Sequence, residues 1–147
     1  DPFSSAFGAH VTISLSGESQ VGFSYADFEQ EKTRPERKQL VGVDALWTHD
    51  RFELSGEAVY RSSDKGGAAD EKGAFVQLAA PLTERLYLVG RFETYKFSQD
   101  SHSTDMWVGG LNFRLRPSLV LKAEWLEAKH NTIQAPDGFL TSISVLL

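Results

Sequence analysis

The feature that most constrains this chain is a series of nine short runs in which apolar and polar residues alternate. One run reads FELSGEAVYR over residues 52–61, with apolar or small residues at the even positions and three charged residues at the odd ones. Side chains alternate between the two faces of a β-strand, so one face of this strand is apolar and the other is charged. A spacing of two, rather than 3.6, disfavours amphipathic helices. The pattern therefore predicts an all-β fold.

The runs and their connections predict an antiparallel up-and-down meander. We expect strands at residues 9–16, 20–28, 39–48, 52–61, 74–81, 86–97, 106–115, 119–129 and 139–147. The composition of 118–129 is also compatible with a helix. Short connections at 16–19, 49–51, 83–85 and 116–118 alternate with long polar loops at 29–38, 62–72, 98–105 and 130–138. Short turns between consecutive strands indicate hairpins, so residues 1–147 are expected to form one β domain.

Composition excludes several classes of protein. Only 41% of the 147 residues are hydrophobic, and no run approaches the 18 apolar residues of a transmembrane helix. A transmembrane strand needs only about 9–11 residues, half of them apolar, so it remains compatible with this composition. The net charge of −5 argues against nucleic-acid binding, and the absence of cysteine excludes disulfides and thiolate chemistry.

No constellation of residues predicts catalysis, a metal ion or a cofactor. The four histidines are scattered, and no two have the spacing of a metal-binding pair. Glu53 and Glu57 lie on one strand face about 13 Å apart, at ~3.3 Å per residue. That separation exceeds the ~5–9.5 Å between glycosidase carboxylates. Residues 101–105, with the sequence SHSTD, contain residue types found in hydrolase triads, but neighbours in sequence do not simply form one. The chain is therefore expected not to be an enzyme.

The two faces of the predicted sheet differ in chemistry. The apolar positions give four to five uncharged residues per strand, about the height of the apolar band of a membrane barrel. Aromatic residues lie near the strand ends on this face, except Trp125, which lies nearer mid-strand. The opposite face carries five carboxylates and four cations, which we predict to line a lumen: Asp44, Glu53, Glu57, Arg61, Arg91, Glu93, Arg114, Lys122 and Glu124. Charges of both signs argue against strong anion selectivity.

Residues 9–147 resemble a bacterial outer-membrane β-barrel of the porin-like kind, or its C-terminal part. The most specific likeness is the final run, FLTSISVLL over residues 139–147, which is similar to the terminal strand by which such barrels are recognised for insertion. The family usually ends in an aromatic residue, whereas this chain ends in Leu147. The resemblance implies location in the outer membrane, contact with the lipid bilayer and passive diffusion of small polar solutes. It also implies that the short turns are periplasmic.

Nine strands conflict with this family, because complete bacterial barrels have an even number of strands. One explanation is a tenth strand within residues 1–7. The other is that this chain is the C-terminal part of a larger barrel, whose earlier strands complete the wall. The sequence DPFS at residues 1–4 resembles an internal start and favours the second explanation. A soluble β-sandwich, a small ligand-binding barrel and an outer-membrane lipid-modifying enzyme are the alternatives. Similar strand starts at Val21, Phe52, Leu86 and Leu119 could also indicate a propeller or solenoid repeat, although a meander of equal strands gives the same period.

Overall fold

The structure is a computed structural model that describes residues 3–30, 36–116, 118–131 and 133–145. It contains nine strands and one short 3₁₀ helix, η1 (Gly67–Ala69). The strands are β1 (Phe3–Ser16), β2 (Ser19–Gln30), β3 (Glu36–His49), β4 (Phe52–Ser63), β5 (Glu71–Pro81), β6 (Leu86–Phe97), β7 (Thr104–Arg116), β8 (Leu119–Lys129) and β9 (Gly138–Val145). In the described ranges, no helix is long and apolar enough to span a membrane.

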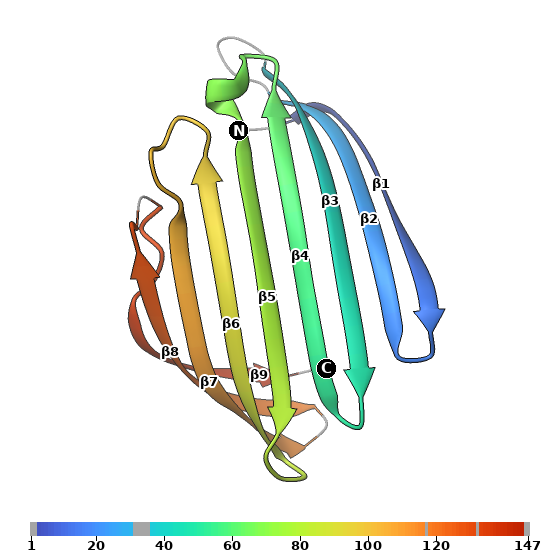
Figure 1. Ribbon diagram of the computed structural model, residues 1–147, viewed down its shortest axis with the longest axis vertical. Coiled ribbons are helices and arrows are strands. Elements are labelled where there is room, and N and C mark those ends of the chain that lie inside the picture. Colours follow the sequence, from blue (N-terminus) through green and yellow to red (C-terminus); the bar gives the residue numbers. More distant parts are fainter. Residues whose placement is uncertain (1–2, 31–35, 117, 132, 146–147) are drawn as a thin grey trace.

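All nine strands form one sheet in which each strand pairs antiparallel with its neighbours in sequence (Figure 1). This order confirms the predicted meander, and residues 119–129 form a strand rather than a helix. The similar strand starts reflect successive hairpins of a single sheet, not propeller blades or solenoid turns. The single sheet also differs from the two packed sheets of a sandwich.

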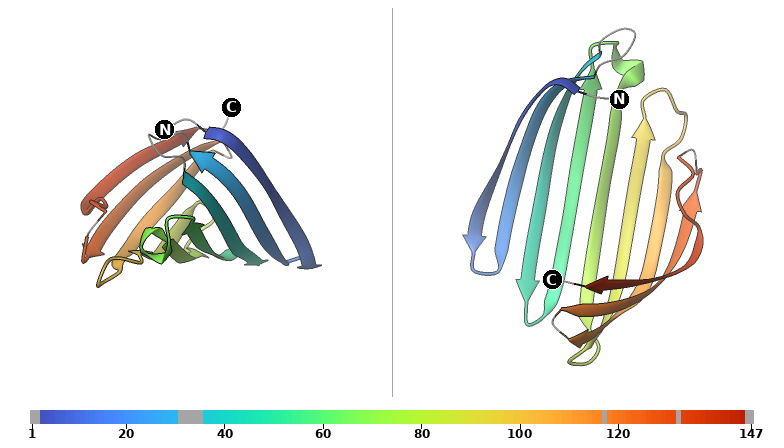
Figure 2. Two further views of the ribbon diagram at one scale, coloured as in Figure 1. Left: turned by 90° about the horizontal axis from the view of Figure 1, so that it is seen from above. Right: turned by 180° about the vertical axis from the view of Figure 1, so that it is seen from behind.

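The sheet is twisted and curved but does not close into a barrel (Figure 2). β1 and β9 are its edges, because each pairs with only one neighbour. The described residues before position 8 belong to β1 and do not form a separate tenth strand. Both edge strands are odd-numbered members of an antiparallel meander, so they run in the same direction.

The strand ends near the tight turns agree with the prediction, but most ends near the long loops extend further. β2 continues to Gln30 and β3 begins at Glu36, inside the predicted loop 29–38. Paired charges explain this extension. Arg37 on β3 lies 2.9 Å from the Asp27 carboxylate on β2, and Arg61 on β4 forms an ion pair with Glu71 on β5. Polar cross-strand pairs thus continue the hydrogen-bonded ladder beyond the apolar stretch.

Side chains are buried mainly on the concave face, where curvature brings them together. Three consecutive residues of β6 show the alternation: Tyr87 is 7% exposed, Leu88 is 48% exposed and Val89 is 5% exposed. Tyr87 and Val89 lie on the same face as the predicted polar residues, whereas Leu88 lies on the predicted apolar face. The convex, outward face is therefore the apolar one.

Candidate functional site

The structure places all nine predicted lumen-lining residues on one face of the sheet. Asp44 lies opposite Glu57, which lies opposite Phe75, which in turn lies opposite Glu93. A second row of opposed residues, Glu53, Ala79, Val89, Gly110 and Glu124, connects β4 to β8. The remaining four predicted residues lie on the same face because side chains alternate along β4, β6, β7 and β8. They are Arg61, Arg91, Arg114 and Lys122. The period-two pattern was thus sufficient to group residues from five strands.

Two arginines of this concave face are held by nearby side chains. Arg91 forms an ion pair with Glu93, and its guanidinium lies 4.1 Å from the centre of the Phe75 ring. Arg114 lies 4.3 Å from the centre of the Tyr87 ring. These contacts limit the freedom of both guanidinium groups, and stacking over an aromatic face adds a cation–π attraction. The face is therefore a structured polar surface rather than a set of independent charges.

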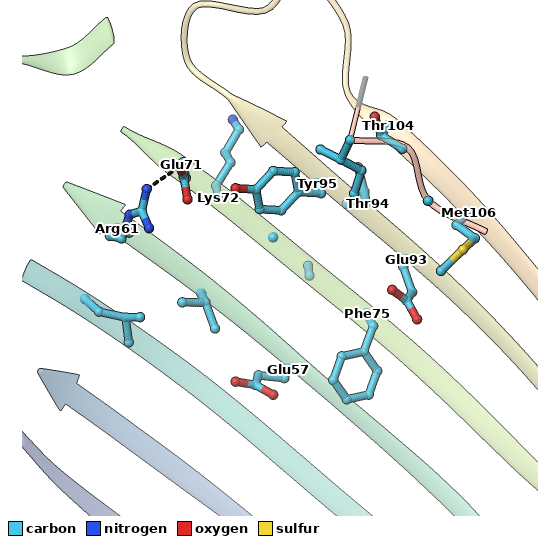
Figure 3. A pocket seen from close by; sticks show the side chains of 16 residues that line it. Glu57, Arg61, Glu71, Lys72, Phe75, Glu93, Thr94, Tyr95, Thr104 and Met106 are labelled. Carbon is cyan, nitrogen blue, oxygen red and sulfur yellow. Dashed lines mark ion pairs between the residues drawn. The ribbon is translucent and has the colours of Figure 1, made fainter. Parts of the chain in front are cut away.

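A hollow of about 390 Å³ opens on the concave face near the loop-side ends of β4–β7 (Figure 3). Glu57, Arg61 and Glu93 provide charges around it, while Phe75 and Tyr95 provide apolar surface. Ile133 and Ala135, from the connection between β8 and β9, also line the hollow. This connection therefore lies over the concave face rather than extending away from the rim.

One aromatic residue of this hollow, Phe75, was not assigned to a face by the sequence-based prediction, whereas Tyr95 was placed on the polar face. Phe75 and Tyr95 occupy positions of their strands that face the same side as Glu57 and Glu93. The signal for Phe75 was available in the alternation itself, because position parity places it on the polar face. A polar face can also contain aromatic partners for arginine, as Phe75 is for Arg91.

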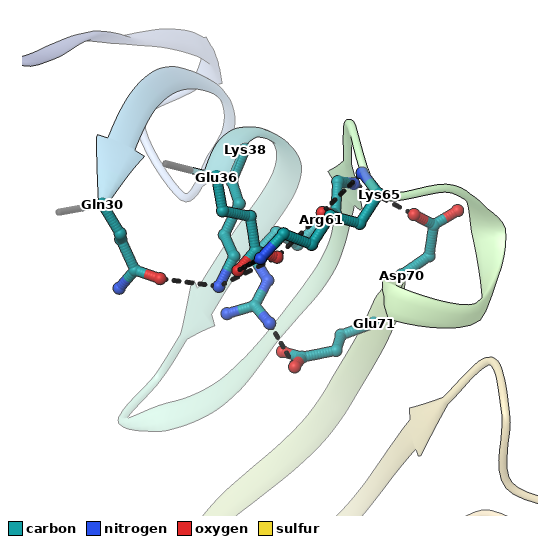
Figure 4. A network of polar contacts seen from close by, with 8 residues as sticks. Gln30, Glu36, Lys38, Arg61, Lys65, Asp70 and Glu71 are labelled. Atoms are coloured by element: carbon teal, nitrogen blue, oxygen red, sulfur yellow. Dashed lines mark hydrogen bonds and ion pairs between the residues drawn. The ribbon is translucent and has the colours of Figure 1, made fainter. Parts of the chain in front are cut away.

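A cluster of polar residues joins three strands at the loop-side rim (Figure 4). The Lys38 ammonium lies 2.7 Å from the Gln30 side-chain oxygen and 3.7 Å from the Glu36 carboxylate. The Glu36 carboxylate also accepts a 2.8 Å hydrogen bond from the Ser63 hydroxyl and lies 3.6 Å from the Lys65 ammonium. Glu36 and Lys38 are both buried, so this cluster holds together the ends of β2, β3 and β4 at the rim of the concave face. Sequence alone assigned this segment to a loop and gave no indication of the cluster.

The convex face exposes a large set of apolar side chains. Apart from Leu82, Ile133 and Leu140, the exposed large hydrophobic residues lie on this face, including Phe23, Val43, Leu54, Val76, Leu88, Leu111 and Ile143. Trp107 and Trp125 are 55% and 60% exposed. Soluble monomers rarely expose a contiguous apolar patch larger than a few hundred Å². The convex face is therefore a candidate contact surface.

The apolar band crosses the strands obliquely. One row of directly opposed residues runs Val11, Phe23, Val43, Ala58, Ala74, Thr94, Asp105 and Lys129 from β1 to β8. This row is apolar as far as β5 and polar from β6 onward. A row nearer the tight turns runs Trp47, Leu54, Leu78, Gly90, Gly109, Trp125 and Phe139, without a charge. The strands are thus tilted relative to the band, as in barrels, where the tilt is about 35–45°.

This tilt corrects the sequence-based view of Trp125. Along the isolated strand Trp125 appeared too central for an interfacial position. In the sheet it lies directly opposite Phe139, the second residue of β9. Trp125 and Phe139 therefore lie at the same height across the sheet, near the loop-side end of the apolar band on the convex face.

The residues of the 101–105 segment contact one another and His130. His102 stacks on His130 with ring centres 4.9 Å apart, while the Ser103 hydroxyl donates a 2.9 Å hydrogen bond to Asp105. Within the described ranges no hydrogen bond joins His102 to a serine, and no group of three or more potential ligands is placed to hold a metal ion. The expectation of a non-enzyme stays a prediction.

Comparisons with known proteins do not assign the chain to a family. A scan against protein families found no match, and a search of curated protein sequences also found none.

Proposed function

We propose that this chain is a wall segment of a porin-like outer-membrane β-barrel, through which small polar solutes diffuse passively. The convex face contacts lipid, and the concave face lines water. The observation that carries this proposal is the gathering of exposed apolar side chains on one face of a sheet whose other face is charged. In lipid, strands satisfy their backbone groups through their neighbours, so a sheet of this kind can span a membrane when its edges are paired in a closed barrel.

The concave face supports a channel rather than a hydrophobic ligand pocket. Carboxylates and cations face the same space from five strands, and several are held by ion pairs or aromatic rings. Charged residues that line a pore influence which ions pass, and charges of both signs make strong anion selectivity unexpected. Small polar solutes are therefore the proposed cargo.

The two free edges indicate that other strands complete the wall. β1 and β9 each expose unpaired backbone groups, for which the hydrocarbon of a bilayer provides no partner. The two edges run parallel, whereas neighbouring strands in bacterial barrels are antiparallel. We infer that strands from a longer product of the same gene, or from a second copy, lie between β1 and β9.

Two measurements test the proposal. The first is extraction: the chain should require detergent, and its gel mobility should change on boiling. A water-soluble, detergent-independent monomer contradicts the membrane assignment. The second is reconstitution of residues 1–147 into planar bilayers, where we expect no stable unitary conductance from the chain as a monomer. Stable conductance from a proven monomer contradicts the need for additional strands while leaving the membrane assignment intact.

A further inference from the structure

Two lysines lie directly opposite each other on the convex face, at the loop-side ends of β5 and β6. Lys72 pairs in register with Lys96, and both extend from the convex face at the point where its apolar stretch ends on these two strands. Like charges in directly opposed cross-strand positions are destabilising. Within the part of the chain that the structure describes, no ion pair joins either ammonium group to a carboxylate. This repulsion has no compensating partner within the described protein.

An open groove of about 700 Å³ lies beside the two lysines on the same face. Its floor contains the short side chains of Ala58 and Ala74, which lie directly opposite each other on β4 and β5. Val43 and Tyr60 form one side. The groove is mostly apolar, and Lys72 and Lys96 stand at its loop-side end. Its apolar lining suits a hydrocarbon chain whose polar head lies between the two ammonium groups.

The level of this groove matches that of lipid headgroups. Tyr60 lies directly opposite Lys72, and the Tyr60 hydroxyl donates a 2.6 Å hydrogen bond to the Asp70 carboxylate beyond the strand end. An aromatic residue with a polar tip next to lysines at the end of an apolar stretch is the arrangement found at a membrane interface. The lysines therefore lie where a lipid phosphate would be within reach.

We propose that this groove binds a lipid whose headgroup carries a phosphate monoester, with the phosphate between Lys72 and Lys96 and an acyl chain over Ala58 and Ala74. A phosphate monoester carries about −1.5 to −2 charges at neutral pH, which matches two ammonium groups. The headgroup removes the like-charge repulsion between the lysines, and the acyl chain covers the small side chains. This proposal rests on the proposed location of the convex face in lipid.

The test is native mass spectrometry of the full chain, folded in a neutral detergent. The probe is phosphatidic acid, compared with phosphatidylcholine that has the same acyl chains. We expect at least a tenfold preference for phosphatidic acid, lost in the Lys72→Gln/Lys96→Gln variant. The charge-matched control Lys65→Gln/Lys129→Gln should retain it, because neither residue lines the groove. Ala58→Leu/Ala74→Leu should fill the floor and weaken binding while keeping both charges.

The outcomes separate this site from the general function. A chain that folds in detergent but retains both lipids equally, or whose preference survives loss of Lys72 and Lys96, overturns the site and leaves the barrel proposal intact. Displacement of phosphatidic acid by millimolar inorganic phosphate overturns the acyl-chain part. A chain that stays soluble and monomeric without detergent overturns the proposed function and the lipid site together.

Discussion

His49 and Glu18 join the first two tight turns of the sheet. The Nδ1 atom of His49, at the end of β3, lies 3.1 Å from each carboxylate oxygen of Glu18, in the turn between β1 and β2. The Thr48 amide donates a 2.7 Å hydrogen bond to the Glu18 carbonyl oxygen, which reinforces this contact. The next turn is connected in a similar way, because Arg51 donates hydrogen bonds to the Thr83 carbonyl oxygen and the Tyr87 hydroxyl. Successive tight turns are therefore tied together along one rim.

The pair of His49 and Glu18 makes this rim sensitive to pH. Hydrogen bonding to Glu18 is the main cause that raises the pKa of His49 above its usual 6.5, and the negative charges of Glu18 and Asp50 add to it. His49 lies beyond Trp47, the last apolar residue of its strand on the convex face. Since the folded-state pKa is raised, the contact contributes fully below pH ~6.5 and is lost as pH rises through the folded-state value.

We expect Glu18→Gln to lower the pKa of His49 towards 6.5. NMR titration of the His49 imidazole in the parent and in the variant measures this shift. His102, whose ring stacks on His130 at the opposite rim, is the internal control, and its chemical shifts at a fixed pH should be the same in both proteins. An unchanged His49 titration in Glu18→Gln would show that the two turns are not coupled.

Arginine in the apolar stretch of the convex face should impair stable insertion. Leu54 and Leu88 are exposed on this face, so Leu54→Arg or Leu88→Arg would place a cation in hydrocarbon. The cost is about 2–4 kcal/mol at the bilayer midplane and decreases towards the interfaces, so Leu54, which lies opposite Trp47 near a tight turn, should give the smaller effect. Insertion into vesicles, followed by gel mobility and protease protection, measures the effect.

Glu57→Gln is the matched control for the arginine variants. Glu57 is in the same strand as Leu54 but on the concave face, so its replacement should leave insertion unchanged. Efficient assembly of both arginine variants contradicts the assignment of the faces.

The two adjacent glycines of β7 should differ in their tolerance of alanine. A Cβ on Gly110 would lie 2.8 Å from the Ala123 carbonyl oxygen of β8, whereas a Cβ on Gly109 meets nothing within 4 Å. Overpacking against backbone costs about 1–3 kcal/mol, so Gly110→Ala should destabilise the sheet by this amount. Gly109→Ala should be neutral or slightly stabilising. Urea unfolding in lipid vesicles compares the two, and equal stabilities would contradict the β7–β8 packing.

The connections on one rim should be accessible from outside the cell. We expect labelling and proteolysis of intact cells at residues 64–70 and 98–103, which are polar connections at the loop-side rim. The predicted loop 29–38 should also be accessible, although its residues 31–35 lie outside the described part. Residues 130–137 should be less accessible, because Ile133 and Ala135 line the concave hollow. Labelling from outside at the tight-turn positions Asp50, Glu84 and 117 instead would show that the topology is inverted. Position 117 lies outside the described residues.

The sequence by itself determined the strands and the chemistry of their faces. Alternation places Glu57 and Leu54 on opposite sides whatever the strand pairs with, because the backbone geometry of a strand sets this period. The short turns determined four of the eight antiparallel pairs, since two to four residues between strands allow only an antiparallel neighbour. For these reasons nine polar residues could be assigned to one face before the register was known.

Only the tertiary structure decided what depends on register and curvature. The level of Trp125 follows from its partner Phe139 across β8 and β9, and no local pattern encodes that partner. The opposition of Lys72 and Lys96, and the extension of β2 and β3 into a predicted loop, also depend on pairing between strands. The structure also decided that β1 and β9 do not pair with each other. Closure requires strand tilt and stagger to agree around the whole wall, which is a property of the assembled sheet and not of any one run of residues.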